Sequence, residues 1–314
     1  MTDRITRRTV LHASAGLMAG VTVSPTLIFA ADSAPLAKDA LAGKIALVTG
    51  STDGLGKAVA LKLANAGAHV IVHGRNRERG EAVVKQINAL KAGGAMFYAA
   101  DFSSLAEVRK FASAVLADHK RLHLLINNAG IGSANPDGSK NRTVSADGYE
   151  QRFAVNYLSG YLLTRLLLPT IVASAPARIV NIASLAQRAI EFDNVMLERD
   201  YDGSRAYGQS KLAQILFTQD LAAELAGKNV TANCLHPATY MDTAMVRDAG
   251  VQPRATVDEG AEAVVYVATS PDLDGKSGLF FNGKREMRAN AQAYDTAARA
   301  KLKELSDKLV DAAA

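Results

Sequence analysis

A tyrosine and a lysine stand four residues apart in the stretch YGQSK, which runs from Tyr207 to Lys211. In a helix, residues i and i+4 share one face and lie one turn apart, so the lysine ammonium would lie near the phenol. A free phenol has a pKa of about 10, and a cation ~4 Å away at an effective dielectric constant of ~20 contributes ~4 kcal/mol, or about three pKa units. We therefore expect Lys211 to bring the pKa of Tyr207 towards ~7, where a general acid or base works best.

A serine stands where it could hold a substrate beside this pair. Ser184 ends the stretch RIVNIAS, at the expected carboxyl end of a strand. Its hydroxyl would hydrogen-bond a substrate oxygen and so place the reacting carbon. The pattern Tyr-x-x-x-Lys occurs by chance in many helices, and its position after a serine-tipped strand is what makes it informative.

The stretch ALVTGSTDGLGKAVALKLANAG predicts a strand over residues 45–49, a glycine turn, and a helix that begins near Leu55. Glycine permits backbone angles that other residues avoid. It also lets amide groups approach a pyrophosphate, toward which the helix N-terminus adds about half a positive charge. Three glycines in such a row are also compatible with a plain tight turn. Because the turn follows the first strand of an alternating chain, we expect a dinucleotide to bind to Gly50, Ser51, Thr52, Asp53, Gly54, Leu55 and Gly56.

The end of the second expected strand bears on which dinucleotide is bound. A fold that prefers NAD usually carries a carboxylate about 20 residues after the glycines, where it accepts a hydrogen bond from the ribose 2′-hydroxyl. In VIVHGRNR that position is Gly74, and Arg75 follows it with a guanidinium that can bind a 2′-phosphate. The sequence therefore predicts NADP(H), with NAD(H) as the alternative. Arg77 could assist Arg75 in binding the phosphate. The alternative is that Arg75 is only a solvated side chain after the strand and binds no phosphate.

Six short apolar stretches alternate with longer stretches of helical periodicity. They are KIALVTG, HVIVHG, AMFYAAD, LHLLINNAG, ARIVNIAS and NVTANCLHP. Strands separated by helix-length segments form βαβ units, so we expect an α/β fold with a doubly wound parallel sheet of about seven strands and helices on both faces. Ligands of such a sheet bind at the carboxyl ends of its strands. We expect one domain over residues 41–314, ending in a terminal helix, after a short connector at residues 32–40.

Composition argues against several classes of function. Of the 314 residues 48% are hydrophobic and 21% charged, and the net charge of +5 is spread without a Lys/Arg block, so we do not expect nucleic-acid binding. Cys234 is the only cysteine, so no intramolecular disulfide can form, and its apolar surroundings in the sequence favour a buried thiol. No histidine or cysteine pair has metal-ligand spacing, so we expect no metal site. After the first 31 residues, no apolar run reaches the ~18–20 residues that span a bilayer.

The first residues have the features of an export leader. In TRRTVLHASAGLMAG, Arg7 and Arg8 lead into an apolar run of small residues. Such a pair fits the twin-arginine export signal, which is an address rather than part of the fold. We expect residues 1–31 to direct the protein to the periplasm through the twin-arginine export machinery. Cytoplasmic localisation, or a membrane tether if the leader is uncleaved, are the alternatives. Because this route carries folded proteins, the nucleotide would be bound before export.

Together these stretches resemble the short-chain dehydrogenase/reductase family. Its single-domain members carry TGxxxGxG, which this chain shows from Thr49 to Gly56, and NNAG, here at residues 127–130. The similarity covers nearly all of the chain from Leu41 on. The stretches FDNVMLERDYDGSRAYGQSKLAQILFTQDLAAEL and SPDLDGKSGLFFNGK are similar to the retinol-dehydrogenase-like and protochlorophyllide-reductase-like branch. The resemblance implies a single-domain Rossmann fold and NADP(H)-dependent interconversion of a carbonyl and an alcohol on a bulky, apolar small molecule.

The resemblance also implies a catalytic set of four residues. Tyr207 is the general acid/base, Ser184 binds the substrate oxygen, and Lys211 also binds the nicotinamide ribose. Asn156, in FAVNYLSGYLLT, completes the set through a water next to the lysine.

Further residues are expected at the cofactor by the same resemblance. Asp101 holds the adenine at the end of the third strand, and Thr243 contacts the nicotinamide carboxamide. The remaining expected contacts are Phe102, Asn128, Ala129, Gly130 and Pro237, together with Tyr207 and Lys211. The family usually has Pro-Gly after the sixth strand, whereas this chain has Ala238 in place of the glycine. The substrate loop begins two residues later, so this departure bears on substrate identity.

Two other functions share these residues. A non-enzymatic redox sensor of the same fold would report nucleotide state to a partner, although such proteins commonly lose the tyrosine or the lysine. A dehydratase or isomerase would use the cofactor site without net turnover. The sequence does not set the substrate, the direction or the oligomeric state. A homo-oligomer through the helices that hold Asn156 and Tyr207 is one option.

Overall fold

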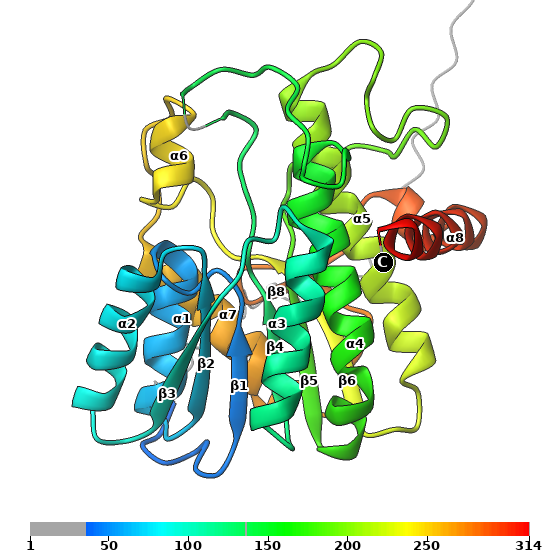
Figure 1. Ribbon diagram of the computed structural model, residues 1–314. Helices are drawn as coiled ribbons and strands as arrows, with labels where there is room; N and C mark the ends of the chain where they lie inside the picture. Colours follow the sequence, from blue (N-terminus) through cyan, green and yellow to red (C-terminus); the bar gives the residue numbers. More distant parts are fainter. Residues whose placement is uncertain (1–35, 136, 314) are drawn as a thin grey trace, which may run out of the picture. The chain divides into compact units, whose positions relative to one another are not determined.

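The strand order of the sheet reverses between its two central strands, β1 and β4. The computed structural model describes residues 36–135 and 137–313, and its eight strands follow the order β3-β2-β1-β4-β5-β6-β7-β8 (Figure 1). Ligands of doubly wound sheets bind outside the carboxyl ends of the strands at such a reversal. The strands are β1 (Ile45–Val48), β2 (His69–Gly74), β3 (Gly94–Ala99), β4 (Leu124–Asn127), β5 (Ala177–Ile182), β6 (Val230–His236), β7 (Phe280–Asn282) and β8 (Arg285–Met287).

The expected α/β fold is confirmed, with one strand more than the seven or so that we expected. The additional strand is β8, which pairs antiparallel with β7, whereas the other neighbouring strands are parallel. The two are joined by Gly283 and Lys284, and Gly283 has a φ of +60°, as the first residue of a two-residue hairpin turn often requires. Three-residue strands are too short to show a period in the sequence.

Helices cover both faces of the sheet. One hydrophobic cluster joins α1, α2 and α7 to one face, and the other joins α3, α4, α5 and α8 to the opposite face. Leu47 of β1 belongs to the second cluster, while its neighbours Ala46 and Val48 belong to the first, as the alternation of a strand requires. The helices are α1 (Gly54–Asn65), α2 (Arg77–Ala89), α3 (Leu105–Asp118), α4 (Ser159–Ala173), α5 (Gly203–Glu224), α6 (Ala244–Asp248), α7 (Val257–Thr269) and α8 (Thr296–Ala312), with shorter helical turns η1 (Phe153–Leu158), η2 (Pro271–Leu273) and η3 (Ala291–Tyr294).

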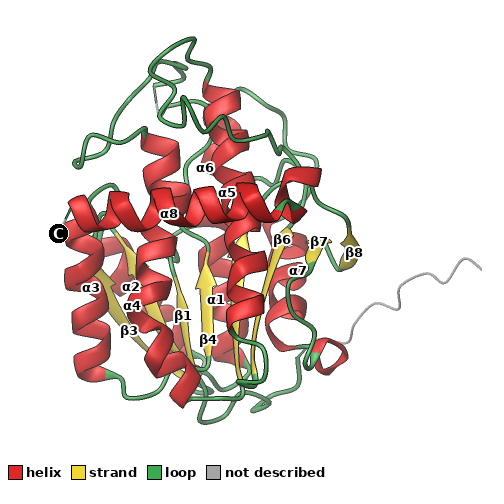
Figure 2. Cartoon of the chain, turned by 90° about the vertical axis from the view of Figure 1, so that its right-hand side faces the viewer, coloured by secondary structure: helices red, strands yellow, loops and turns green. Residues whose placement is uncertain are grey.

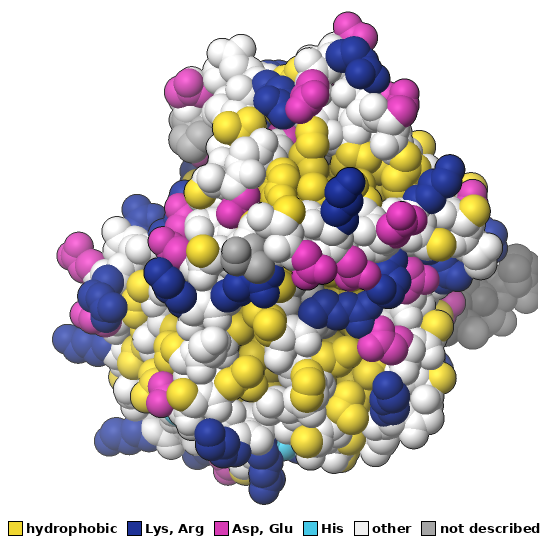
Figure 3. Space-filling view, turned by 45° about the vertical axis from the view of Figure 1, so that its right-hand side comes forward, with side chains coloured by type: hydrophobic (Ala, Val, Ile, Leu, Met, Phe, Trp, Pro, Cys, Tyr) yellow, Lys and Arg dark blue, Asp and Glu magenta, His cyan; other side chains and the backbone are white. Residues whose placement is uncertain are grey.

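The expected terminal helix is α8, and it lies across the helices of the second cluster (Figure 2). The Arg109 guanidinium on α3 donates to the Val310 carbonyl at 2.7 Å, and Tyr157 hydrogen-bonds Ser306 at 2.7 Å. The charged residues Lys301 and Glu304 of α8 are exposed. Figure 3 shows Lys/Arg and Asp/Glu side chains mixed across the middle of this face of the molecule. The helix α8 of the same chain therefore covers part of the helical segments that hold Asn156 and Tyr207.

The fold begins before residue 41, where we expected it to start. Leu36 and Leu41 pack against the cluster around α1, and the Leu41 amide donates to the Ala66 carbonyl at 2.7 Å. The leader expected over residues 1–31 lies outside the described residues. In the part of the chain that the structure describes, no helix is both long enough and apolar enough to cross a membrane.

Candidate active site

The glycine turn lies between β1 and α1, at the carboxyl edge of the sheet. Gly50 and Gly54 have φ of +63° and +50°, a region in which only glycine is unstrained. A Cβ on Gly56 would lie 2.3 Å from the Gly50 carbonyl oxygen, so the turn packs against the helix too closely for a side chain. Asp53 caps α1 by accepting from the Gly54 amide at 2.7 Å, and the first turn carries no acidic residue. The Asp53 carboxylate therefore lies at the positive end of the α1 dipole, and the first turn adds no second carboxylate.

The end of β4 is fastened to this turn by side chains. The Thr49 hydroxyl accepts from the backbone amides of Asn128 and Ala129, both at 2.9 Å. The Asn128 side chain donates to the carbonyls of Thr49 at 2.8 Å and Gly50 at 3.1 Å. The structure thus assigns the Asn128 amide to shaping the turn. Ala129 lies so close that a Cβ on Gly50 would be 2.9 Å from its Cα.

His73, which sequence reasoning missed, links the turn to the adenine side of the expected site. Its Nδ1 accepts from the Gly50 amide at 3.0 Å, and its Nε2 lies 3.2 Å from the Ala100 carbonyl. The ring stacks on Phe102 with centroids 4.0 Å apart. Burial lowers the pKa of His73 to about 3, so the ring is neutral and the carbonyl partner places its proton on Nε2. A histidine inside an apolar strand was the only sequence signal.

Three further residues expected at the cofactor, Ser51, Leu55 and Asp101, lie at the glycine turn or directly after β3. The Ser51 hydroxyl donates to the Val48 carbonyl at 2.7 Å, and Leu55 packs its side chain into the core, so it can meet a ligand only through its backbone. Asp101 follows β3, where its carboxylate accepts from the Ser103 amide at 2.9 Å.

The end of β2 has no room for a carboxylate. A Cβ on Gly74 would lie 2.6 Å from the Thr52 methyl carbon. Arg75 lies nearby, with Nη1 3.8 Å from Asp101, and Arg79 has its Nη1 3.7 Å from Asp53. Both guanidiniums are exposed, so their existing ion pairs are weak and a stronger anion could displace them. Arg79 is a second candidate phosphate ligand that sequence reasoning missed.

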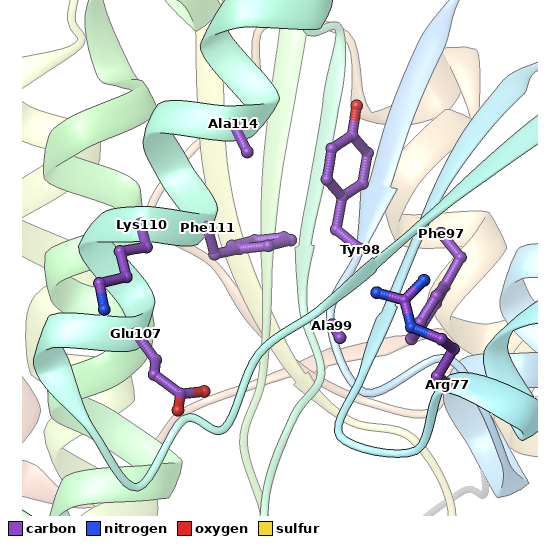
Figure 4. A pocket seen from close by; sticks show the side chains of 8 residues that line it. All are labelled: Arg77, Phe97, Tyr98, Ala99, Glu107, Lys110, Phe111 and Ala114. Carbon is purple, nitrogen blue, oxygen red and sulfur yellow. The ribbon is translucent and has the colours of Figure 1, made fainter.

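Arg77, the expected assistant, faces elsewhere. Its guanidinium carbon lies 5.9 Å from the centre of the Phe97 ring, and its Nη1 lies 3.4 Å from Glu81. It lines a cavity of about 480 Å³ along the outer edge of β3, opposite Glu107 and Lys110 of α3 (Figure 4). Apart from Arg77, none of the residues expected at the cofactor lines that cavity.

The hydroxyls of Ser184 and Tyr207 meet beyond the end of β5. Ser184 follows the strand, and its Oγ accepts from the Ala186 amide at 3.1 Å. Tyr207 lies near the start of α5, where the chain is held by the Asp202 cap. Burial raises the pKa of Tyr207 above its ordinary value, and the hydrogen bond with Ser184 lowers it by less. The phenol is therefore protonated at neutral pH.

The lysine does not acidify this phenol as we expected. The Lys211 ammonium donates to the Ile182 carbonyl at 2.8 Å and to Gln214 Oε1 at 3.1 Å, and it lies 5.7 Å from the centre of the Tyr207 ring. Burial also lowers the pKa of Lys211 to about 7, so only part of its charge remains near neutral pH. The spacing brings the two residues onto one side of α5, but it does not determine where the flexible ammonium points.

Asn156 lies in a π-helical turn and reaches the same place. Its Oδ1 accepts from the Ile131 amide at 2.7 Å, and its Nδ2 donates to the Ile131 carbonyl at 3.1 Å and to Ser210 at 2.9 Å. A Cβ on Gly130 would lie 3.2 Å from Asn156 Oδ1 and 3.5 Å from Lys211 Nζ. Asn156 and Lys211 are both buried, and a side chain at position 130 would crowd the Asn156 amide.

Segments after β4, β5 and β6 cover this edge of the sheet as a roof, with α6 at the upper left of Figure 1. Pro237 directly follows β6, and Thr243 begins α6, with its methyl 3.5 Å from the position of a Cβ on Gly54. A Cβ on Gly132 would lie 2.8 Å from Met245 Cγ, so α6 touches the loop after β4.

A buried ion pair holds the roof to the insert that precedes Tyr207. Glu150 and Arg152 are both fully buried and 3.5 Å apart. The Arg152 guanidinium donates to the carbonyls of Gly132 and Ser133, each at 3.0 Å, and to the Tyr201 hydroxyl at 2.8 Å. The pair was not identified from the sequence, because an arginine two residues after a glutamate carries no recognisable pattern.

These residues suit a dinucleotide and a carbonyl or alcohol. Backbone at Gly50 and Gly56 is too close-packed for a Cβ, and a Cβ on Gly130 would crowd Asn156, so glycine at all three positions lets the backbone lie close to a cofactor along this edge. Two hydroxyls, on Ser184 and Tyr207, are placed to hold one oxygen. Among the described residues, no cluster of three or more His, Cys, Asp or Glu side chains could hold a metal ion.

Comparison with known proteins points in the same direction. Residues 44–253 match the family described as short chain dehydrogenase. Retinol dehydrogenase 14 of Mus musculus is 37% identical over 294 residues, covering 85% of this chain and 86% of that protein. An uncharacterised protein from Mycobacterium paratuberculosis has a similar structure, with a TM-score of 0.70 and 30% identity over 86% of this chain and 94% of its own. A short chain dehydrogenase of Shigella flexneri, complexed with NADP, has a TM-score of 0.62 and 25% identity over 79% of this chain and 100% of its own.

Proposed function

Because the chain belongs to the short-chain dehydrogenase/reductase family, whose members are oxidoreductases, we propose that it uses NADP(H) to interconvert a carbonyl and an alcohol on a bulky, apolar small molecule. The observation that carries this proposal is the meeting of the Ser184 and Tyr207 hydroxyls beyond β5, beside Lys211. Two hydroxyls at one point can hold a single substrate oxygen in a fixed direction.

The residues divide the work as follows. The dinucleotide would supply hydride for reduction or accept it for oxidation. Ser184 and Tyr207 would hydrogen-bond the substrate oxygen, and the Tyr207 hydroxyl, protonated because its pKa is raised, would donate its proton to that oxygen during reduction. The ammonium of Lys211, released from Gln214, would bind ribose hydroxyls beside Gly130.

Two observations support an apolar substrate. Relatives named retinol dehydrogenase are similar over most of their length. Four of the six large hydrophobic side chains that are exposed in the described part of the chain lie in the roof segments around the site. These are Val144, Leu185, Tyr240 and Met245. Purified protein with NADPH and a series of apolar aldehydes and ketones, followed at the absorbance of reduced nicotinamide, tests this part; turnover confined to small polar carbonyls would contradict it.

The preference for NADP rests on the end of β2. Because Thr52 fills the space beside Gly74, no carboxylate is there to repel a 2′-phosphate, and the guanidiniums of Arg75 and Arg79 are within reach. We expect the double variant Arg75→Ala/Arg79→Ala to weaken NADPH binding about tenfold or more, with little change for NADH. The matched control is Arg77→Ala, since Arg77 lies against Phe97 and Glu81. Equal losses for both nucleotides, or none, would contradict the preference.

We also propose export through the twin-arginine machinery. Its support is the sequence alone, because Arg7, Arg8 and the apolar run lie outside the described residues. Changing both arginines to lysine should retain the protein in the cytoplasmic fraction. Unchanged fractionation would remove the proposal.

A further inference from the structure

The loop after the catalytic serine, residues 185–190, is held from outside by side chains far along the chain. It contains no helix or strand, and its carbonyls and amides make few bonds to each other. The Arg188 amide donates to the Gly208 carbonyl at 3.2 Å, which ties the loop to α5 one residue after Tyr207. A Cβ on Gly208 would lie 2.6 Å from the Arg188 side chain, so this approach is tight.

Two glutamine amides connect this loop to a segment just before α8, residues 289–294. Gln187 donates from Nε2 to the Ser184 carbonyl at 3.0 Å and accepts at Oε1 from the Asn290 amide at 2.7 Å. Gln292 accepts at Oε1 from the Ile190 amide at 2.7 Å and donates from Nε2 to the Ile190 carbonyl at 3.1 Å. All four partners are backbone groups of fixed polarity, so the orientation of both amides is determined by chemistry.

The segment that receives the loop is itself well fixed. The Ala289 amide donates to the Tyr294 hydroxyl at 3.0 Å, and the Gln292 amide donates to Asn290 Oδ1 at 3.0 Å. Ala293 is fully buried and packs in the same cluster as α5. The loop is therefore tied to a rigid support rather than to a second loop.

Glutamine is the residue type that this linkage needs. Ile190 is 3% exposed, so its amide and carbonyl need protein partners, and one glutamine amide satisfies both. A glutamate of the same length offers acceptors only and would place a carboxylate against the carbonyl of Ser184 or Ile190.

We propose that Gln187 and Gln292 are positioning residues that fasten loop 185–190 to the C-terminal segment 289–294 and so fix Ser184 relative to Tyr207. This rests on the proposed function for its effect on catalysis, but the fastening itself does not. The C-terminal segment is thereby part of the apparatus that places the substrate oxygen, although it contributes no group that touches it.

Amide hydrogen exchange of the full chain, measured by NMR without ligand, tests the fastening. Gln187→Met should speed exchange at Asn290, and Gln292→Met at Ile190, each by at least about fivefold, the factor for a hydrogen bond of ~1 kcal/mol. Gln86→Met, on the exposed side of α2, is the control and should change neither. Unchanged exchange at both amides would overturn the proposal.

Steady-state kinetics test the positioning. With Gln187→Glu, the Asn290 bond is retained and the Ser184 bond is lost, so exchange at Asn290 should stay within about twofold of the wild type while kcat falls about tenfold. The affinity for NADPH should stay within about twofold of the wild type. A general loss of folding would lower this affinity as well, so the measurement separates the two causes. A wild-type kcat in Gln187→Glu and Gln187→Met would overturn the positioning role. If the wild type turned over no carbonyl at all, the proposed function would fail while the exchange result still decided the fastening.

Discussion

The cofactor side and the substrate side of this site are built from different kinds of contact. On the cofactor side, glycines within one short turn approach backbone so closely that Gly56 has no room for a Cβ. On the substrate side, the loop after Ser184 is held by Gln292, 102 residues from Ile190, and the roof by the buried Arg152. Long-range side-chain contacts hold both sides, as Asn128 does at the turn, but the cofactor side also needs glycines that carry no side chain. We therefore expect substitutions on the substrate side to change stability and the placing of the substrate, and added side chains on the cofactor side to change NADPH affinity.

The largest expected effect is on the substrate side, from Arg152→Met. Removing the guanidinium leaves Glu150 buried without its cation and leaves the carbonyls of Gly132 and Ser133 without a donor. Breaking a buried pair by removing one partner costs about 3–5 kcal/mol of the free energy of unfolding. Urea unfolding measures this. Arg199→Met is the control, because its pair with Asp193 is exposed, and it should change stability by less than about 1 kcal/mol. Equal stability of Arg152→Met and the wild type would show that the roof does not depend on this pair.

A smaller effect, of the opposite sign, is expected at the junction of the two sides. Burial lowers the pKa of Lys211 from 10.5 to about 7, so the folded state binds the lysine proton less tightly than the unfolded state. The unfolded chain therefore holds more protons between pH ~7 and ~10, and the destabilisation is greatest below pH ~7 and disappears as pH rises towards 10. At pH 6.5 the lowered pKa corresponds to ~4–5 kcal/mol of destabilisation. Losing the bonds to Ile182 and Gln214 offsets ~1–2 kcal/mol of this, so Lys211→Met should raise the free energy of unfolding by about 3 kcal/mol, and most of the gain should vanish at pH 10. A gain that did not depend on pH would mean that lost charge burial is not its cause.

The smallest of these effects is on the cofactor side, from Gly56→Ala. Its Cβ would lie 2.3 Å from the Gly50 carbonyl oxygen and 2.5 Å from Asn128 Nδ2, so the turn must shift. Isothermal titration should show NADPH binding weakened about 30-fold, or ~2 kcal/mol. Gly160→Ala in α4 is the matched control, since its Cβ would have ordinary contacts, with Asn127 Cγ at 3.6 Å. If Gly56→Ala bound NADPH as the wild type does, the turn would not be the phosphate site.

What the sequence could predict depends on local pattern and is found on both sides of the site. The strands, the glycine turn and the positions of Ser184, Tyr207 and Asn156 depend on local pattern, and the structure places them together at one edge of the sheet. Lys211 lies beside the Tyr207 ring as expected, but its ammonium donates to Ile182 and Gln214, which no spacing rule predicts.

The contacts that the sequence could not predict join residues that are distant along the chain. His73, Arg152, Gln187 and Gln292 each bond to backbone groups whose positions exist only once the sheet has formed. The short strand β8 was missed for a different reason, since three residues carry too little periodicity.

The most direct test of the central claim is hydride transfer by Tyr207→Phe. This variant keeps the ring and removes only the hydroxyl that meets Ser184. With NADPH deuterated at C4 and an apolar aldehyde, the wild type should transfer one hydride stereospecifically to the carbonyl. Tyr207→Phe should lower kcat by about 10²-fold or more while NADPH affinity stays within about twofold. Transfer by Tyr207→Phe at the wild-type rate, or substrate conversion by the wild type without net oxidation of NADPH, would contradict the account.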